Sequence, residues 1–214
     1  MDIINFITPT EEKQETKKDL RESIAIKQSN INANIPKRFE KTLLGDYPVP
    51  FLDKLKPLCL TRNASNIILI TGPRGTGKST LVTAMQHERA LNGFDEGLYF
   101  NVRLLKPTLD ATMSFSAKEN RLEFYTRLSD YDFLVIDEAG TCEDSKIERE
   151  FFRTLLPLCY DNLSTVAIAT NLSASGFKNL ILGSNAEDTD PVIDRIKECL
   201  HHFNLLGESH RGEK

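Results

Sequence analysis

The nine residues GPRGTGKST, at positions 72–80, have the composition and spacing needed to bind a chain of phosphates. They match the pattern G-x-x-x-x-G-K-[ST] of a nucleotide-binding P-loop. Its glycines let the backbone wrap an anion without a Cβ in the way, and the N–H groups of the loop point at that anion. The residues expected to contact the nucleotide are Gly72, Pro73, Arg74, Gly75, Thr76, Gly77, Lys78, Ser79 and Thr80.

Two side chains of this loop carry distinct chemistry. Lys78 supplies a positive charge to the β- and γ-phosphates, and the hydroxyl of Ser79 is a ligand for Mg²⁺. The apolar run NIILIT precedes the loop, and LVTAMQHERAL, with helical periodicity, follows it. A strand before the loop and a helix after it are the context that the motif requires. The loop alone does not separate kinases, GTPases, transporters and mechanical ATPases.

A pair of carboxylates ends a second apolar run. The stretch FLVIDE closes on Asp137 and Glu138, at the end of a strand expected over 132–137. Carboxylates at such a place are costly to bury unless they meet polar partners. Asp137 fits the Walker B role of holding Mg²⁺ directly or through water, and Glu138 fits a general base for the attacking water. The alternative interpretation is two exposed carboxylates at a strand end.

Asn171 ends the next apolar strand, in ATNLS. If the sheet is ordered in the usual way, this amide emerges at the same edge as Asp137. A neutral amide there can orient the water or sense the γ-phosphate, whereas a plain cap of the following helix is the alternative.

These motifs need a sheet to position them. Strands are expected over 66–71, 97–102, 132–137 and 165–170, before a last apolar stretch, HHFNLLG. Helices are expected over 9–29, from residue 48, from the P-loop to about 91, near 103–112 and 117–129, over 144–159, and near 173–181 and 190–199. Apolar strands that alternate with helices predict an α/β fold, in which helices cover both faces of a parallel sheet.

The N-terminal region differs in character from the rest. The helix expected over 9–29 is charged and has few apolar positions, and the Asn-rich SNINANIP at 29–36 resembles a linker. The helix is either solvated or an arm that becomes ordered on a partner protein. We therefore divide the chain into an arm and linker, 1–34, and a core, 35–214, and expect the core to fold without residues 1–30.

Composition excludes several classes of function. The chain has 214 residues, 40% of them apolar, and a formal net charge of −4, which argues against non-specific nucleic-acid binding as the main activity. No apolar run reaches the ~18 residues of a membrane span, and the N-terminus lacks the features of a secretory signal. The four cysteines have neither metal-binding nor C-x-x-C spacing. These features predict a cytoplasmic protein with reduced thiols and no membrane association.

In this order and spacing, GPRGTGKST, FLVIDEAG and IATNLS resemble the AAA+ ATPases, and within them the DnaC/IstB-type helicase-loader group. The lead-in NIPKRFEKTLLGDY, the segment PVIDRIKE and the ending LLGESHRG resemble the corresponding parts of that group. The resemblance covers about residues 35–212. It implies ATP and Mg²⁺ as cofactors and ATP hydrolysis as the activity.

The resemblance also implies two arginines of the site. Arg195, in IDRI, matches the arginine finger that reaches the γ-phosphate bound by a neighbouring subunit, and Arg211, in ESHRG, matches the sensor-2 arginine. The sequence departs from the group's pattern at LCYDNL, where relatives carry Arg-Tyr, and at Pro191, where relatives carry a second arginine. We also expect no helical lid domain, since nothing follows the last strand.

Two functions follow from this resemblance. The first is an ATPase that loads or remodels a hexameric replicative helicase on DNA, and the second is an IstB-like helper of a transposase. Both imply self-association through the ATP sites. Single-stranded DNA is a further candidate partner for the basic residues of the insertion at 103–122: Arg103, Lys106, Lys118 and Arg121. A small-molecule kinase would need an arginine-rich lid that the sequence lacks, and the intact Glu138 argues against a nucleotide-binding module without turnover.

Overall fold

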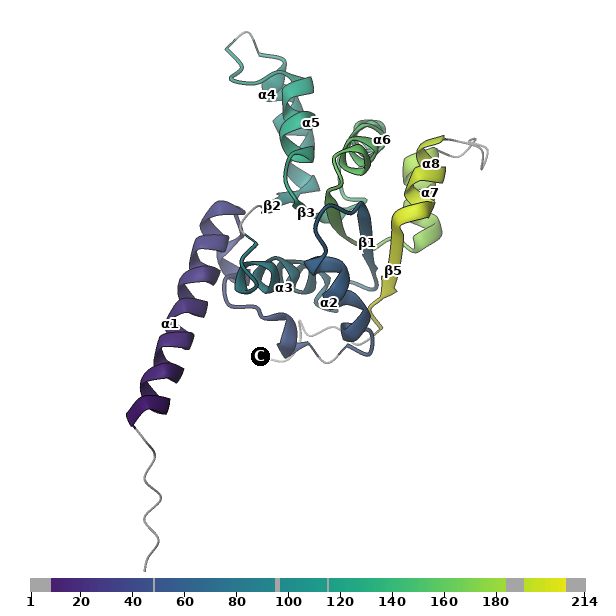
Figure 1. Cartoon of the computed structure of the whole chain (residues 1–214). Coiled ribbons are helices and arrows are strands. Elements are labelled where there is room, and N and C mark those ends of the chain that lie inside the picture. The colour runs from purple at the N-terminus through teal and green to yellow at the C-terminus, as the bar shows by residue number, and fades with distance from the viewer. Residues whose placement is uncertain (1–8, 48, 95–96, 115, 184–190, 207–214) are drawn as a thin grey trace, which may run out of the picture.

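The structure is a computed structural model that describes residues 9–47, 49–94, 97–114, 116–183 and 191–206 (Figure 1). Its centre is a five-stranded parallel sheet in the order β2-β3-β4-β1-β5. The strands are β1 (Asn66–Thr71), β2 (Gly97–Asn101), β3 (Phe133–Ala139), β4 (Thr165–Thr170) and β5 (Leu200–Asn204). The predicted α/β fold with a parallel sheet is confirmed, and HHFNLLG contributes the strand next to β1.

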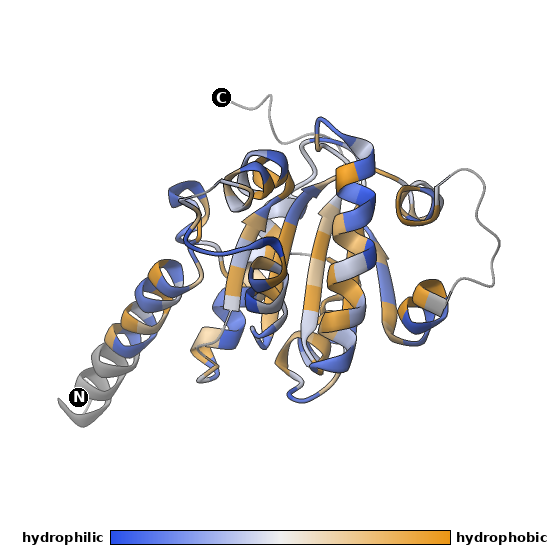
Figure 2. Ribbon diagram, turned by 90° about the horizontal axis from the view of Figure 1, so that it is seen from above, coloured by the Kyte–Doolittle hydropathy of each residue, from blue (hydrophilic) through white to orange (hydrophobic). Residues whose placement is uncertain are grey.

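Helices cover both faces of this sheet, as Figures 1 and 2 show. The α-helices are α1 (Pro9–Asn32), α2 (Leu52–Leu60), α3 (Lys78–Leu91), α4 (Leu105–Thr112), α5 (Arg121–Ser129), α6 (Ser145–Asp161), α7 (Ala174–Leu182) and α8 (Pro191–Cys199). Three short 3₁₀ turns, η1 (Lys37–Phe39), η2 (Leu44–Asp46) and η3 (Val102–Leu104), connect them. No helix of the described ranges is both long enough and apolar enough to span a membrane.

The alternation of side chains along β1 divides the core into two layers. Ile68 and Ile70 pack with α2 and α3, whereas Ile67 and Leu69 pack with the helices of the opposite face, α4 to α8. Every residue of β1 and β4 is buried. Central strands that are covered on both faces need continuous apolar runs, which is the pattern of NIILIT and TVAIAT.

The α4–α5 pair projects from the sheet beside β2 (Figure 1). We expected its second helix from residue 117, but α5 begins later because Asn120 caps it. The Asn120 side chain accepts from the N–H of Glu123 at 3.0 Å, and the Glu123 carboxylate accepts from the N–H of Asn120 at 2.8 Å. Such a capping box fixes the first turn of a helix.

The prediction of a linker at 29–36 is wrong. Helix α1 continues to Asn32 and leads directly into the core, where Ser29, Ala33 and Ile35 are buried. The contacts of Asn30 explain why the Asn-rich composition of this segment suggested a linker. The side-chain amide of Asn30 bonds the carbonyl of Glu40 and the ring of His87, with an Asn30 Oδ1–His87 Nε2 distance of 2.7 Å. An asparagine that suggested a loop by propensity is fixed here by tertiary hydrogen bonds.

Residues 29–35, which we call the arm root, therefore belong to the core in packing terms. The outer part of α1 extends away from the body (Figure 1), and it exposes Leu20 and Ile24. Ile31, in the arm root, is also exposed. Removal of residues 1–30 would take away the contacts of Ser29 and Asn30 as well as the outer arm.

Candidate nucleotide-binding site

The P-loop leaves the carboxyl end of β1 and turns into α3. Gly72, Gly75 and Gly77 all have positive φ, at 147°, 89° and 89°. The backbone at Gly72 also leaves no room for a side chain, because a Cβ there would overlap the carbonyl oxygen of Leu205. Two constraints therefore require glycine at the entrance of the loop, the second of which comes from the residue after β5.

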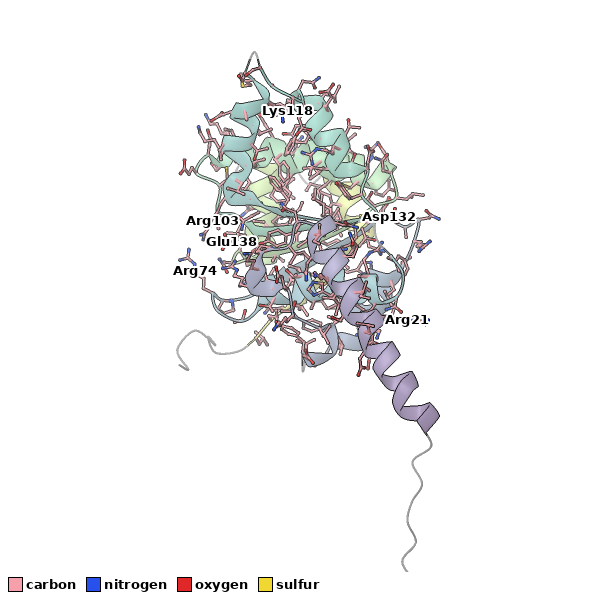
Figure 3. The ribbon with its side chains drawn as sticks, turned by 90° about the vertical axis from the view of Figure 1, so that its left-hand side faces the viewer. Arg21, Arg74, Arg103, Lys118, Asp132 and Glu138 are labelled. Atoms are coloured by element: carbon pink, nitrogen blue, oxygen red, sulfur yellow. The ribbon has the colours of Figure 1, made fainter. Side chains whose placement is uncertain are left out.

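Lys78 is buried at the start of α3, and its ammonium lies against the loop. Lys78 Nζ donates to the carbonyl oxygens of Gly72 at 2.9 Å and Pro73 at 2.6 Å. Thr76 braces the same turn by donating from Oγ1 to the Pro73 carbonyl at 3.0 Å. Arg74, by contrast, is exposed and points away from the body (Figure 3). The predicted phosphate cradle thus combines glycine backbone, one enclosed cation and an outer arginine.

Thr80 lies in the first turn of α3 and bonds a residue that sequence reasoning missed. Tyr47, which follows η2, makes a side-chain hydrogen bond with Thr80. A Cβ on Gly77 would lie 3.5 Å from the same tyrosine ring. Tyr47 therefore packs against the P-loop from the segment that leads into the core.

Asp137 is brought to the P-loop from 58 residues away in the sequence. Its Oδ1 accepts from the hydroxyl of Ser79 at 2.8 Å and from the N–H of Glu138 at 2.8 Å. Its Oδ2 accepts from the hydroxyl of Tyr99 at 2.6 Å. A carboxylate and a hydroxyl that meet at the phosphate end of a P-loop are the oxygen donors that Mg²⁺ prefers, so these residues fit that ion.

The environment of Asp137 is almost dry, since the residue is 1% exposed. Burial raises the pKa of its carboxyl group, and the hydrogen bonds from Tyr99, Ser79 and the Glu138 backbone oppose that rise. Three donors therefore offset part of the cost of keeping a carboxylate at this depth.

Glu138 follows Asp137 in an unusual backbone conformation, with φ of 60°. The pairing of β3 with β4 shifts in register between Ile136 and Ala139, around this residue. A non-glycine residue in the left-handed region is strained, and such strain is frequent at functional positions. The turn redirects the Glu138 side chain, which is not fully buried, while Asp137 stays enclosed.

Arg103 and Asn101 hold the Glu138 carboxylate. Arg103 Nε lies 2.6 Å from Glu138 Oε2, and Asn101 Nδ2 donates to the same oxygen at 3.3 Å. Figure 3 shows Arg103 beside Glu138, on the side of the molecule that also presents Arg74. Arg103, which we considered for DNA contact, is thus the partner of the candidate general base.

Asn171 lies directly after β4, at the same edge of the sheet as Glu138. Ala139 pairs with Thr170, and Thr170 Oγ1 donates to the Ala139 carbonyl at 2.6 Å. Asn171 is exposed. The structure therefore brings Asn171 to the end of the sheet where the candidate general base emerges.

The two arginines taken from the resemblance stand apart from this group. Arg195 is exposed on α8, while its neighbours Ile193, Ile196 and Cys199 pack into the core. Among the contacts of the described ranges, none joins Arg195 to the P-loop. Arg211 lies outside the described residues.

Glu148 is a further residue that sequence reasoning missed. It lies on the buried face of α6 at 1% exposure, and its carboxylate accepts from the N–H groups of Gly140 and Cys142, the second at 3.1 Å. Burial raises its pKa, and the two backbone donors oppose that rise. The sequence did indicate a buried carboxylate here, because Glu148 shares one helical stripe with the apolar residues Phe151, Phe152 and Leu155. Glu148 thus fixes the loop that follows Glu138.

Comparisons with known proteins agree with this geometry. The family described as "IstB-like ATP binding protein" matches residues 2–214. The chain belongs to this family. A curated relative of the IstB-like chain is the replicative helicase loader DnaC of Buchnera aphidicola subsp. Schizaphis graminum (strain Sg), 26% identical over 129 residues. That match covers 60% of the chain and 49% of the relative, so the chain spans about half the length of the curated relative that it matches.

Solved structures support the fold of the IstB-like chain. A crystal structure of the DnaC helicase loader is 20% identical, with a TM-score of 0.60 over 80% of this chain and 100% of that one. A crystal structure of DnaI is 18% identical, with a TM-score of 0.60 over 82% and 94%. The replication initiator DnaA, bound to AMPPCP and single-stranded DNA, is 14% identical, with a TM-score of 0.62 over 81% and 51%. These likenesses confirm the AAA+ type of P-loop fold.

Proposed function

We propose that this IstB-like protein hydrolyses ATP and uses the cycle to load or remodel a hexameric replicative helicase on DNA. The observation that carries the proposal is the convergence of Ser79, Asp137 and Glu138 at the mouth of the P-loop. Lys78 and the loop backbone would bind the phosphates, and Ser79 with Asp137 would hold Mg²⁺. That ion would supply charge neutralisation at the phosphates when bound. Glu138 would accept the proton of the attacking water, and Asn171 would orient that water.

The outer part of α1 is the element that we propose for docking to the helicase. Its exposed apolar residues Leu20 and Ile24 and the exposed Ile31 of the adjoining arm root are separated by four and then seven positions, which places all three along one side of the helix. Burial of such side chains contributes about 1.5–3 kcal/mol each, which favours association with an apolar groove and offsets part of the entropic cost of binding. The relation to a curated helicase loader favours a helicase as the owner of that groove.

The second candidate function is that of an ATPase helper of a transposase. The family description, IstB-like, favours it, and the same site chemistry would serve it. The partner bound by α1 separates the two functions, because the ATPase core is common to both.

Assembly through the ATP sites is part of both candidates. Arg195 would act as an arginine finger in the site of a neighbouring subunit, and its exposure on α8 supports that role. Single-stranded DNA would bind near the α4–α5 projection through Lys106, Lys118 and Arg121. Of these, Lys106 and Arg121 carry acidic neighbours, Asp110 at 3.0 Å and Glu150 at 3.9 Å.

Two measurements test the proposed function. In the first, Glu138→Gln should keep ATP affinity and lose turnover, because the amide preserves shape and cannot take a proton; undiminished turnover would remove Glu138 as the base. In the second, the full chain and a Leu20→Asp/Ile24→Asp variant are tested for binding to the host's purified replicative helicase and to a purified transposase from the same host. Helicase binding that the double variant abolishes supports the loader. Capture of the transposase alone would select the second function.

A further inference from the structure

Tyr99 is a buried residue in the middle of β2 whose hydroxyl reaches the carboxylate of Asp137. The two oxygens of that carboxylate have different partners. Oδ1 accepts from Ser79 and from the Glu138 backbone, whereas Oδ2 accepts only from Tyr99 among the described hydrogen bonds, at 2.6 Å. The carboxylate is thus divided between an oxygen that faces the P-loop serine and an oxygen that is fixed by the core.

The bond from Tyr99 restrains the rotation of the Asp137 carboxylate plane, which the other two bonds leave largely free. The terminal torsion of an aspartate is broad, so its carboxylate plane rotates easily. Both remaining donors bind Oδ1, and bonds to one oxygen restrain rotation of the plane less than bonds to both. A donor on Oδ2 therefore sets which oxygen stands beside Ser79.

Tyr99 is itself held from outside the sheet. It belongs to the edge strand β2, and its backbone N–H donates to the carbonyl of Ala33, in the arm root, at 2.7 Å. The Phe39 ring packs against the Tyr99 ring, with 6.4 Å between their centroids. An edge N–H would otherwise meet solvent, so the arm root fixes the backbone that carries the hydroxyl.

We propose that Tyr99 is a positioning residue that orients Asp137 so that Oδ1 and the Ser79 hydroxyl together face a divalent cation bound with the nucleotide. The inference rests on the proposed ATPase function, because it concerns the same site. Groups that orient a metal ligand typically change metal affinity by about 10- to 100-fold when they are removed. Hydroxyl deletion at Tyr99 should act in this way and should leave the phosphate cradle intact.

The test compares Tyr99→Phe with Tyr125→Phe. Both tyrosines are buried, at 6% and 5% exposure, but Tyr125 packs on the opposite face of the sheet. Binding of a fluorescent, non-hydrolysable ATP analogue is measured in EDTA and over a Mg²⁺ titration. Tyr99→Phe should raise the Mg²⁺ midpoint by about tenfold or more, with affinity in EDTA unchanged, and Tyr125→Phe should behave as wild type.

An unchanged midpoint in Tyr99→Phe, or an equal shift in both variants, would overturn the inference. So would a wild-type affinity that does not respond to Mg²⁺. A wild-type protein that bound no analogue at all would instead count against the proposed ATPase. Should Tyr99→Phe fail to fold, Tyr99→His, whose shorter ring does not reach Asp137 Oδ2, provides the second variant. It should raise the Mg²⁺ midpoint in the same way with affinity in EDTA unchanged, and a wild-type midpoint in Tyr99→His would contradict the proposal.

Discussion

Arg103 and Glu138 form an ion pair in which Arg103 Nε lies 2.6 Å from Glu138 Oε2. The arginine side chain is 63% exposed and the glutamate side chain 18% exposed. The described contacts of Arg103 and Asn101 both fall on Oε2 and fix the direction of this carboxylate, whereas a general base must be able to turn toward the water. The pair is therefore a restraint on the proposed general base, and its exposed member is open to competing anions.

Arg103→Ala should raise basal ATP turnover several-fold with little change in ATP affinity, because the restraint on Glu138 is removed while the P-loop is untouched. Turnover and analogue binding are measured side by side. The control is Arg127→Ala, which breaks a comparable pair with Glu119 at 2.8 Å on α5, away from the site. Equal or lower turnover in Arg103→Ala would show that the pair does not restrain the base.

Lys78→Ala should weaken ATP binding by on the order of 100-fold, since bonds to charged groups contribute about 1.5–3 kcal/mol. Arg62→Ala provides the control and should bind as wild type, because Arg62 is exposed and lies before β1, at the other end of that strand from the P-loop. Equilibrium binding of a labelled ATP analogue measures both variants. Wild-type affinity in Lys78→Ala would remove the phosphate-cradle interpretation of the loop.

Arg195→Ala should bind ATP nearly normally and hydrolyse it poorly, because a finger acts mainly on the charge of the transition state. A mixture of Arg195→Ala and Glu138→Gln chains should recover part of the activity. At a shared interface, one variant supplies the glutamate and the other the arginine. No recovery, under conditions in which wild-type chains are shown to associate, would contradict the shared site.

Truncation before and after the arm root should have different effects. Deletion of residues 1–24 should leave the free energy of unfolding within about 0.5 kcal/mol of wild type, since positions 19–24, whose burial the structure describes, are all exposed, and it should impair partner binding. Deletion of residues 1–36 should destabilise by several kcal/mol, because it leaves buried polar groups of Gln86 and His87 without partners.

Urea unfolding of both truncated chains measures the difference. Burial lowers the pKa of His87, and its backbone contact with Thr42 opposes that shift. A uniformly mild effect of both deletions would show that the arm root does not contribute to the core.

Local sequence patterns predicted most of the fold because the central strands are apolar runs and the helices that pack on them show a helical period. Ser79, Asp137, Glu138 and Asn171 could be placed together because parallel strands end at one edge of the sheet. The partners of these residues could not be predicted. Tyr99 and Asn101 approach the site only through the register of β2 against β3, in which Asn101 pairs with Asp137, and no local pattern encodes that register.

The arm root escaped prediction for a related reason. Its small and amide side chains carry no apolar period, and their burial depends on partners on α3 and β2 that are distant in the sequence. Glu148 was within reach of sequence reasoning, because a carboxylate on an apolar helical stripe must find donors.

The hydrogen bond from Tyr99 to the Ala33 carbonyl has a consequence for solubility. An open edge strand invites pairing with another chain, and proteins protect such edges by covering them. The arm root occupies one backbone position at the outer edge of β2 and so hinders strand addition there. A proteolytic cut that released the root would then do more than remove a docking helix. It would leave the backbone groups of the edge strand β2 open to pairing with a strand of another chain, and the truncated core would be prone to aggregate through β2.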